Sequence, residues 1–180
     1  LAAKFLAIEH QLATKDRIVD TKADTLYNLF TATRTTPLTI TEQEMDDYSA
    51  AATETLERMS AVFEDSDPLL SSIGTVVVYY VVFRDPTLPM ADLRPRLGTF
   101  EELRRAASRM GEDNPDYATP VNARLREYNV FVQSTNDGRA LTRRAQILTA
   151  YLTQFTPSEP TQGLAGLGDG ELPEHDESDT

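Results

Sequence analysis

The segment Ser72–Arg84 contains the longest apolar stretch of the chain, eight residues without a charge. Such a stretch is too short to span a bilayer, so it is expected to be buried in protein. Its β-branched residues favour a strand, but no second alternating run is present to pair with one, and a lone strand would leave its backbone groups unpaired. We therefore predict a central helix, buried all round, with Val77, Tyr80 and Val81 in the core.

Apolar residues at spacings of three and four predict further helices before this segment. The first covers Leu1–Leu12. The second is expected to begin at a capping box made by Thr21 and Asp24, and to carry Tyr27 and Phe30 on its buried stripe. Two such short helices joined by a short connection are expected to pack in antiparallel fashion.

The clearest helical period lies in Thr41–Glu64, where an apolar stripe that includes Leu56 runs through about six turns. Thr41 is a favourable N-cap, and Glu44 three residues later completes a capping-box pattern. Acidic residues in the first turn also suit the positive end of the helix dipole. This segment is predicted to be an amphipathic helix.

After the central segment, Asp85–Pro95 holds three prolines and is predicted to be a loop. Thr99 is expected to cap the next helix, with Leu103 on its inner side. A further stripe begins at Val121. Residues 133–138 have the composition of a turn, and the last helix is predicted from a stripe formed by Leu141, Ala145, Leu148 and Leu152.

Together these segments predict an all-α fold of about seven helices in a single domain, residues 1–156, organised around the buried helix 72–84. Residues 157–180 are rich in glycine and acidic residues and sparse in apolar ones. Such a segment cannot bury enough apolar surface to offset the entropy lost on ordering. It is predicted to be a disordered acidic tail.

The net charge of −12 is unevenly distributed along the chain. The tail 157–180 contributes −7 of it, which leaves −5 for residues 1–156. Segment 94–144 instead carries ten arginines and seven acidic residues, a net charge of +3. Because salt screens such fields over about 10 Å, only a partner at close range would sense this arginine-rich segment.

Composition argues against several kinds of site. The chain has no cysteine, which excludes disulfides and thiolate metal sites and is typical of a reducing compartment, so a cytoplasmic location is the default expectation. Its two histidines, His10 and His175, are too few for a histidine-rich metal site or a catalytic triad. No signal peptide and no apolar run of membrane-spanning length is present. We expect no cofactor, no metal and no membrane partner.

Four carboxylates near the start of the third predicted helix could in principle hold Mg²⁺ or act as an acid and base; they are Glu42, Glu44, Asp46 and Asp47. Acidic residues in a first helical turn are more often explained by the helix dipole and by solubility. A hydrolase with a carboxylate site is therefore the third-ranked hypothesis.

The arginines Arg139, Arg143 and Arg144 form the cluster with the most functional weight. Arg139 and Arg143 lie four residues apart on one helix face, and Asn136 and Asp137 stand where an N-cap is expected. A guanidinium offers a planar fork of donors to phosphate, so we predict nucleic-acid contact by these three side chains. The alternative is that they form a solvated or acid-paired surface.

Three segments resemble the C-terminal helical half of the ParB-like restriction-associated family, whose N-terminal domain carries an Asp-Gly-Gln-Gln-Arg signature. The similarity covers about 150 residues and rests on segments 1–30, 56–84 and 126–148. In that family the N-terminal domain binds or hydrolyses nucleotide or cuts DNA, often in defence against phage, and the helical half supports it. The signature itself is missing from this chain, so no catalytic residue is transferred to it.

The resemblance implies a non-catalytic helical accessory domain of a DNA-defence or DNA-processing protein, with an N-terminal ParB-like domain of the same protein as its partner and DNA as a further contact. The chain begins at Leu1 within a helical pattern, so we expect a fragment of a longer protein. The alternative is a helical protein-interaction adaptor whose acidic tail binds a basic partner. Salt-dependent DNA affinity would favour the first hypothesis, and tail-dependent protein binding the second.

Overall fold

The computed structural model describes residues 1–34 and 39–154, and the prediction of an all-α fold is confirmed within these ranges. The tail predicted at 157–180 lies outside the described residues. The elements in chain order are α1 (Ala2–Lys15), α2 (Ala23–Ala32), α3 (Glu42–Ser60), the short 3-10 helix η1 (Pro68–Leu70), α4 (Ile73–Phe83), α5 (Leu93–Arg109), α6 (Pro120–Phe131) and α7 (Gly138–Gln154).

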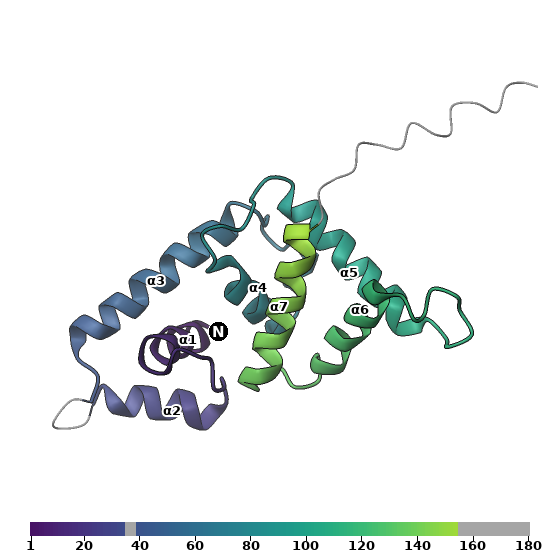
Figure 1. Ribbon diagram of the computed structural model, residues 1–180. Coiled ribbons are helices and arrows are strands. Elements are labelled where there is room, and N and C mark those ends of the chain that lie inside the picture. The colour runs from purple at the N-terminus through teal and green to yellow at the C-terminus, as the bar shows by residue number, and fades with distance from the viewer. Residues whose placement is uncertain (35–38, 155–180) are drawn as a thin grey trace, which may run out of the picture.

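Helix α4 lies at the centre of the molecule and packs against α3 and α7 (Figure 1). Every residue from Gly74 to Phe83 is buried except Val81. The predicted buried helix is thus confirmed, with Val77 and Tyr80 in the core. Val81 was expected there as well, but it is only half-buried, because it faces an open groove along α7.

The core has two parts. The larger cluster is built around α4 and receives side chains from α1, α3, α5, α6 and α7. It is held in part by aromatic pairs, such as the stacked rings of Phe5 and Tyr80, whose centroids lie 4.1 Å apart. A smaller cluster joins α1, α2 and α3 through Ala7, Leu29, Ile40 and Tyr48. Because α1 contributes to both clusters, it connects α2 to the rest of the fold.

Ion pairs tie the helices together at the edge of the core. Glu9 of α1 is buried and accepts two hydrogen bonds from Arg84, at 2.7 and 2.9 Å, and one from the hydroxyl of Tyr80, at 2.5 Å. Asp67 accepts two from Arg94 of α5. Each of these carboxylates is buried against a guanidinium, which provides the compensation that a buried charge requires.

The start of α2 differs from the prediction. Lys22 is the N-cap and makes no side-chain capping bond, whereas Thr21 is buried and its amide donates to Asn136. Tyr27 is 71% exposed and Phe30 is also exposed, because Leu29 takes the core position of this helix. The capping box expected at Thr21 and the stripe expected through Tyr27 were therefore wrong.

The capping box of α3 is confirmed. The hydroxyl oxygen of Thr41 accepts from the amide of Glu44 at 3.2 Å, and the amide of Thr41 donates to the Glu44 carboxylate at 2.7 Å. Satisfying these otherwise orphaned groups fixes the first turn of the helix. Three positions that were predicted to face inward are exposed instead; they are Leu56, Leu103 and Val121.

Helix α5 begins earlier than predicted, at Leu93, so the loop 85–95 ends sooner. Pro95 fits the first turn of the helix, where its missing N–H group would have had no intrahelical partner. Thr99 is therefore inside the helix and is not its cap, and its hydroxyl donates to the carbonyl of Pro95 at 3.2 Å. The prolines alone did not locate the start of the helix, because proline occurs both in loops and in the first turn of a helix.

Candidate nucleic-acid interface

Two segments that are far apart in the sequence are joined by backbone hydrogen bonds beside the start of α7. They are the connector 16–22 between α1 and α2 and the turn that precedes α7. The amide of Gly138 donates to the carbonyl of Val19 at 3.0 Å, and the amide of Thr21 donates to the carbonyl of Asn136 at 2.9 Å. The pairing has the geometry of an antiparallel bridge. It fixes the position of the connector relative to α7.

Side chains of α1 strengthen this junction. Gln11 is buried, and its carbonyl oxygen accepts from the amides of Val19 at 2.6 Å and Asp20 at 3.0 Å. Its amide nitrogen donates to the carbonyl of Asp20 at 2.7 Å. Lys4 reaches across from the same helix and donates to the side-chain oxygen of Asn136 at 2.6 Å. The irregular backbone of the connector is thus satisfied by fixed partners.

Asp137 caps α7, as its place in the sequence predicted. Its carboxylate accepts from the amide of Ala140 at 2.9 Å, which satisfies one of the free N–H groups of the first turn. Gly138 follows directly and approaches the connector so closely that a Cβ atom there would collide with the carbonyl oxygens of Ile18 and Val19. The close approach therefore requires glycine at this position.

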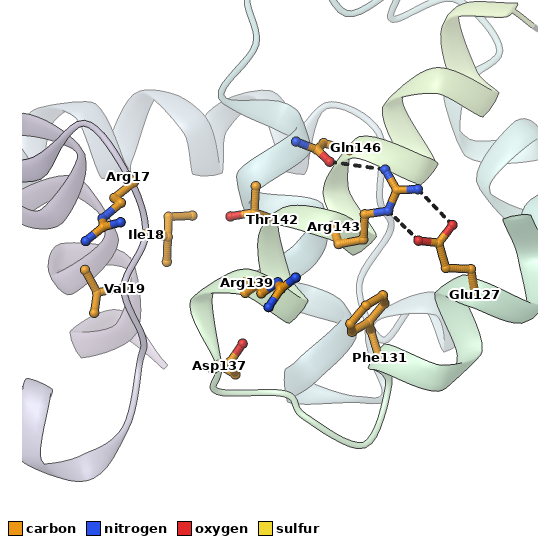
Figure 2. A pocket seen from close by; sticks show the side chains of 10 residues that line it. All are labelled: Arg17, Ile18, Val19, Glu127, Phe131, Asp137, Arg139, Thr142, Arg143 and Gln146. Carbon is orange, nitrogen blue, oxygen red and sulfur yellow. Dashed lines mark hydrogen bonds and ion pairs between the residues drawn. The ribbon is translucent and has the colours of Figure 1, made fainter.

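A pocket of about 650 Å³ opens between the connector, α6 and α7 (Figure 2). The connector contributes residues 17–19, α6 contributes Glu127 and Phe131, and α7 with its cap contributes polar and charged side chains, among them Arg139 and Gln146. Pockets of this size are typical of small-ligand sites. Three arginines and two acidic residues line it, so its local charge is positive although the whole chain is strongly acidic.

The arginines of the pocket differ in how their charge is compensated. Arg143 makes a bidentate ion pair with Glu127, in which Nε and Nη2 donate to the two carboxylate oxygens at 2.6 and 2.8 Å. These hydrogen bonds raise the pKa of the Arg143 guanidinium. The hydrogen bonds from Arg143 lower the pKa of Glu127. Arg17 and Arg139 are exposed and make no side-chain hydrogen bond or ion pair within the described residues. Their donors are free to bind an anion.

Arg144 does not belong to this surface, and its predicted contact with nucleic acid is corrected here. Its side chain is only 1% exposed and lies over the ring of Tyr128, with 4.9 Å between the guanidinium carbon and the ring centroid. It donates weakly to the Tyr128 hydroxyl and to the carbonyl of Gly74, both at 3.4 Å. The cause is its helical position, three residues after Leu141 and four before Leu148, on the buried face of α7.

The structure places Arg139 and Arg143 together in the pocket and adds two residues that no sequence pattern indicated, Arg17 and Phe131. Arg17 lies in a short polar segment between two helices and has no neighbouring motif. Phe131 lies at the last position of α6, outside the inward stripe. The pairing of the connector with the turn before α7 brings Arg17 to the pocket, and the packing of α6 against α7 brings Phe131. No local sequence signal reports either of these long-range contacts.

Two of the four carboxylates at the start of α3, Glu44 and Asp47, make local hydrogen bonds within the helix and its cap. Glu44 is engaged in the capping box, where the amide and hydroxyl of Thr41 lower its pKa. Asp47 accepts from Gln43 at 2.9 Å. Within residues 1–34 and 39–154, no group of three or more histidine, cysteine or acidic side chains is arranged to hold a metal ion.

Comparisons with protein-family models, with curated proteins and with solved structures found no match to this chain. The resemblance to the ParB-like family therefore stays a prediction from sequence. Among the helices of the described residues, none is both long and apolar enough to cross a membrane.

Proposed function

We propose that this chain is a non-catalytic helical domain that contacts the phosphate backbone of DNA through Arg17 and Arg139. The observation that supports the proposal is the presence of two uncompensated guanidinium groups in one pocket, on segments held together by backbone hydrogen bonds. Arginine is suited to such a contact, because its planar fork of donors matches the oxygens of a phosphate group.

The distribution of charge along the chain is consistent with a weak contact between the pocket and DNA. Segment 94–144 carries +3, and the connector adds Arg17 at its edge, but the net charge of the whole chain is −12. Long-range repulsion between the acidic chain and DNA opposes binding, while the local field of the pocket favours it within about one Debye length. We therefore expect weak binding that is strongly reduced by salt.

The resemblance to the ParB-like family suggests a place for such a contact. We propose that the chain is the helical half of a DNA-defence or DNA-processing protein, in which an N-terminal ParB-like domain carries the chemistry. A helical half that holds phosphates would position DNA for that domain. The family relationship and the phosphate contact are separate proposals, since the contact is inferred from the pocket alone.

The test is binding of the 180-residue chain to fluorescently labelled DNA, single-stranded and duplex, over a range of salt concentrations. The variant Arg17→Ala/Arg139→Ala should weaken binding and lower the slope of log affinity against log salt by about 1.5, since about 0.7–0.9 is expected for each phosphate neutralised. The matched control is Arg34→Ala/Arg109→Ala, which removes two exposed arginines outside the pocket and the same total charge.

The control variant should retain most of the affinity and the parental slope. Absence of binding to either form of DNA in low salt would refute the proposal. Equal loss of affinity in the two double variants would also refute it, because binding would then depend on total charge and not on the pocket.

A further inference from the structure

Phe131 is an aromatic side chain without a structural role in the core. It is half-buried, and it is part of neither of the two hydrophobic clusters of the described residues. Its ring instead lines the pocket that contains Arg139 and Arg143 (Figure 2). Val19 on the opposite wall is 40% exposed. The pocket therefore offers an aromatic face and an apolar wall beside its arginines.

Such a combination suits one particular ligand chemistry. Aromatic side chains stack on the bases of single-stranded nucleic acid, and nearby arginines hold the phosphates on either side. A site for phosphate alone would require no aromatic surface. The side chains of Thr142 and Gln146 line the same pocket and add polar groups to it.

We propose that the pocket binds one unpaired base of a DNA strand, stacked on Phe131, with the adjacent phosphates on Arg17 and Arg139. This inference rests on the proposed phosphate contact and extends it by naming the form of DNA. In a duplex each base is stacked between its neighbours, so a base could reach the pocket only by extrusion, which costs the pairing and stacking energy of that base. The chain should therefore prefer single-stranded over duplex DNA.

The first test measures the affinity of the 180-residue chain in low salt for each of three labelled ligands of equal length. They are a thymidine oligonucleotide, an abasic analogue with the same phosphates, and a blunt duplex. The thymidine strand should bind at least fivefold more tightly than the abasic strand, as expected for the loss of one stacked base. Equal affinity for the thymidine and abasic strands would overturn the base site. The phosphate contact would survive that result if binding still depended on Arg17 and Arg139.

The second test changes Phe131 itself. Phe131→Leu keeps an apolar side chain of similar size but removes the aromatic face, so it should weaken binding of the thymidine strand at least fivefold and leave abasic binding unchanged. The chain contains no tryptophan, so Phe131→Trp introduces a single tryptophan, whose emission can be excited selectively over that of the tyrosines. Its emission should be quenched by the thymidine strand and not by the abasic strand.

The two variants make the result independent of a folding defect. Thermal melts followed by circular dichroism show whether Phe131→Leu is folded, and the Phe131→Trp signal reports stacking directly on a variant that still has an aromatic side chain. Parental affinity of folded Phe131→Leu for the thymidine strand would overturn the proposal, and so would an unchanged tryptophan emission at saturating ligand. If no variant and no parent chain binds any ligand, the phosphate contact fails as well.

Discussion

The amide of Gly138 donates a 3.0 Å hydrogen bond to the carbonyl of Val19, across 119 positions of sequence. This bond sets the distance between the connector and α7, and so between Arg17 and Arg139. A side chain at position 138 would have to occupy space that is already filled by backbone oxygens of the connector. The geometry of the pocket therefore depends on a residue that contributes no side chain to it.

Gly138→Ala should destabilise the chain by about 1–3 kcal/mol, as expected when a close-packed contact is overfilled. The connector must also move away from α7, so DNA affinity should fall even where the variant is folded. Urea unfolding followed by circular dichroism measures the first effect, and fluorescence anisotropy in low salt measures the second.

The control for this variant is Gly98→Ala within α5. A Cβ atom there meets only Nη1 of Arg94, at 3.3 Å, which is not one of the two nitrogens that bond Asp67. A small shift of that nitrogen accommodates the methyl group, so the change is expected to be neutral or to stabilise by up to about 1 kcal/mol through the helix propensity of alanine. If Gly138→Ala were as stable as Gly98→Ala and bound DNA as the parent does, the connector would not be held as described.

Asp67 provides a prediction for the pH dependence of stability. Burial would raise its pKa, but hydrogen bonds from Arg94 and from the amide of Leu69 outweigh that effect, so the pKa lies below its ordinary value. A carboxyl group whose folded pKa is lowered contributes stability above its unfolded pKa, about 3.9, and loses that contribution as pH falls through the folded value. Asp67→Asn should therefore cost about 1–3 kcal/mol at pH 7 and progressively less below pH 4.

The measurement is the free energy of unfolding in urea at several pH values between 7 and 2. Asp65→Asn, two residues earlier and exposed, controls for the loss of one carboxylate that makes no ion pair in the described structure. A difference between parent and Asp67→Asn that stayed constant down to pH 2 would show that the ion pair with Arg94 does not stabilise the fold.

The sequence predicted the fold better than it predicted the site. The central helix could be derived because an apolar run with no partner strand has only one way to satisfy its backbone when buried. Helix boundaries were less accurate where two signals competed, as at Pro95, which is compatible with both a loop and a first helical turn. The pocket could not be derived, because Arg17 and Arg139 are brought together by backbone pairing that is not encoded in either local segment.

The error at Arg144 was avoidable from sequence. The stripe that predicted α7 already placed position 144 between Leu141 and Leu148 on one face, so a charged residue there had to be buried or the stripe had to be wrong. The structure shows the first outcome, with Tyr128 covering the guanidinium. Proximity to Arg143 in sequence is not proximity on a helix surface, since adjacent residues point about 100° apart.

The burial of Arg144 predicts opposite effects for two substitutions. Arg144→Ala leaves a cavity beside Tyr128 and should destabilise by about 2–5 kcal/mol. Arg144→Met fills much of the same space and removes a buried charge that has no acidic partner in the described residues, so it should be close to neutral or stabilising. Thermal and urea unfolding of both variants measure the difference.

Neither variant should change the salt dependence of DNA binding while it is folded, in contrast to the variants of Arg17 and Arg139. A lowered slope for folded Arg144→Met would show that its guanidinium reaches phosphate after all. A variant that combined Ala at positions 139, 143 and 144 would be a poor test of DNA contact. The substitution at position 144 destabilises the whole chain, and unfolded protein would be mistaken for protein that does not bind.

The acidic tail provides the last prediction, which is based on its sequence since residues 157–180 lie outside the described residues. Deleting them removes seven carboxylates and no basic side chain, which changes the net charge from −12 to −5. The weaker repulsion should raise DNA affinity in low salt, and the gain should shrink as salt shortens the Debye length. The melting temperature should stay nearly unchanged, because the segment has few apolar residues to bury.

A chain of full length in which the seven acidic residues of the tail are replaced by Asn or Gln separates charge from length. It should bind DNA as the deletion variant does, since both variants remove the same seven negative charges and so the same repulsion of DNA. If the neutralised chain bound no better than the parent while the deletion did, the tail would obstruct the pocket by its bulk. A fall of many degrees in the melting temperature of either variant would instead show that the tail docks on the helical domain and contributes to its stability.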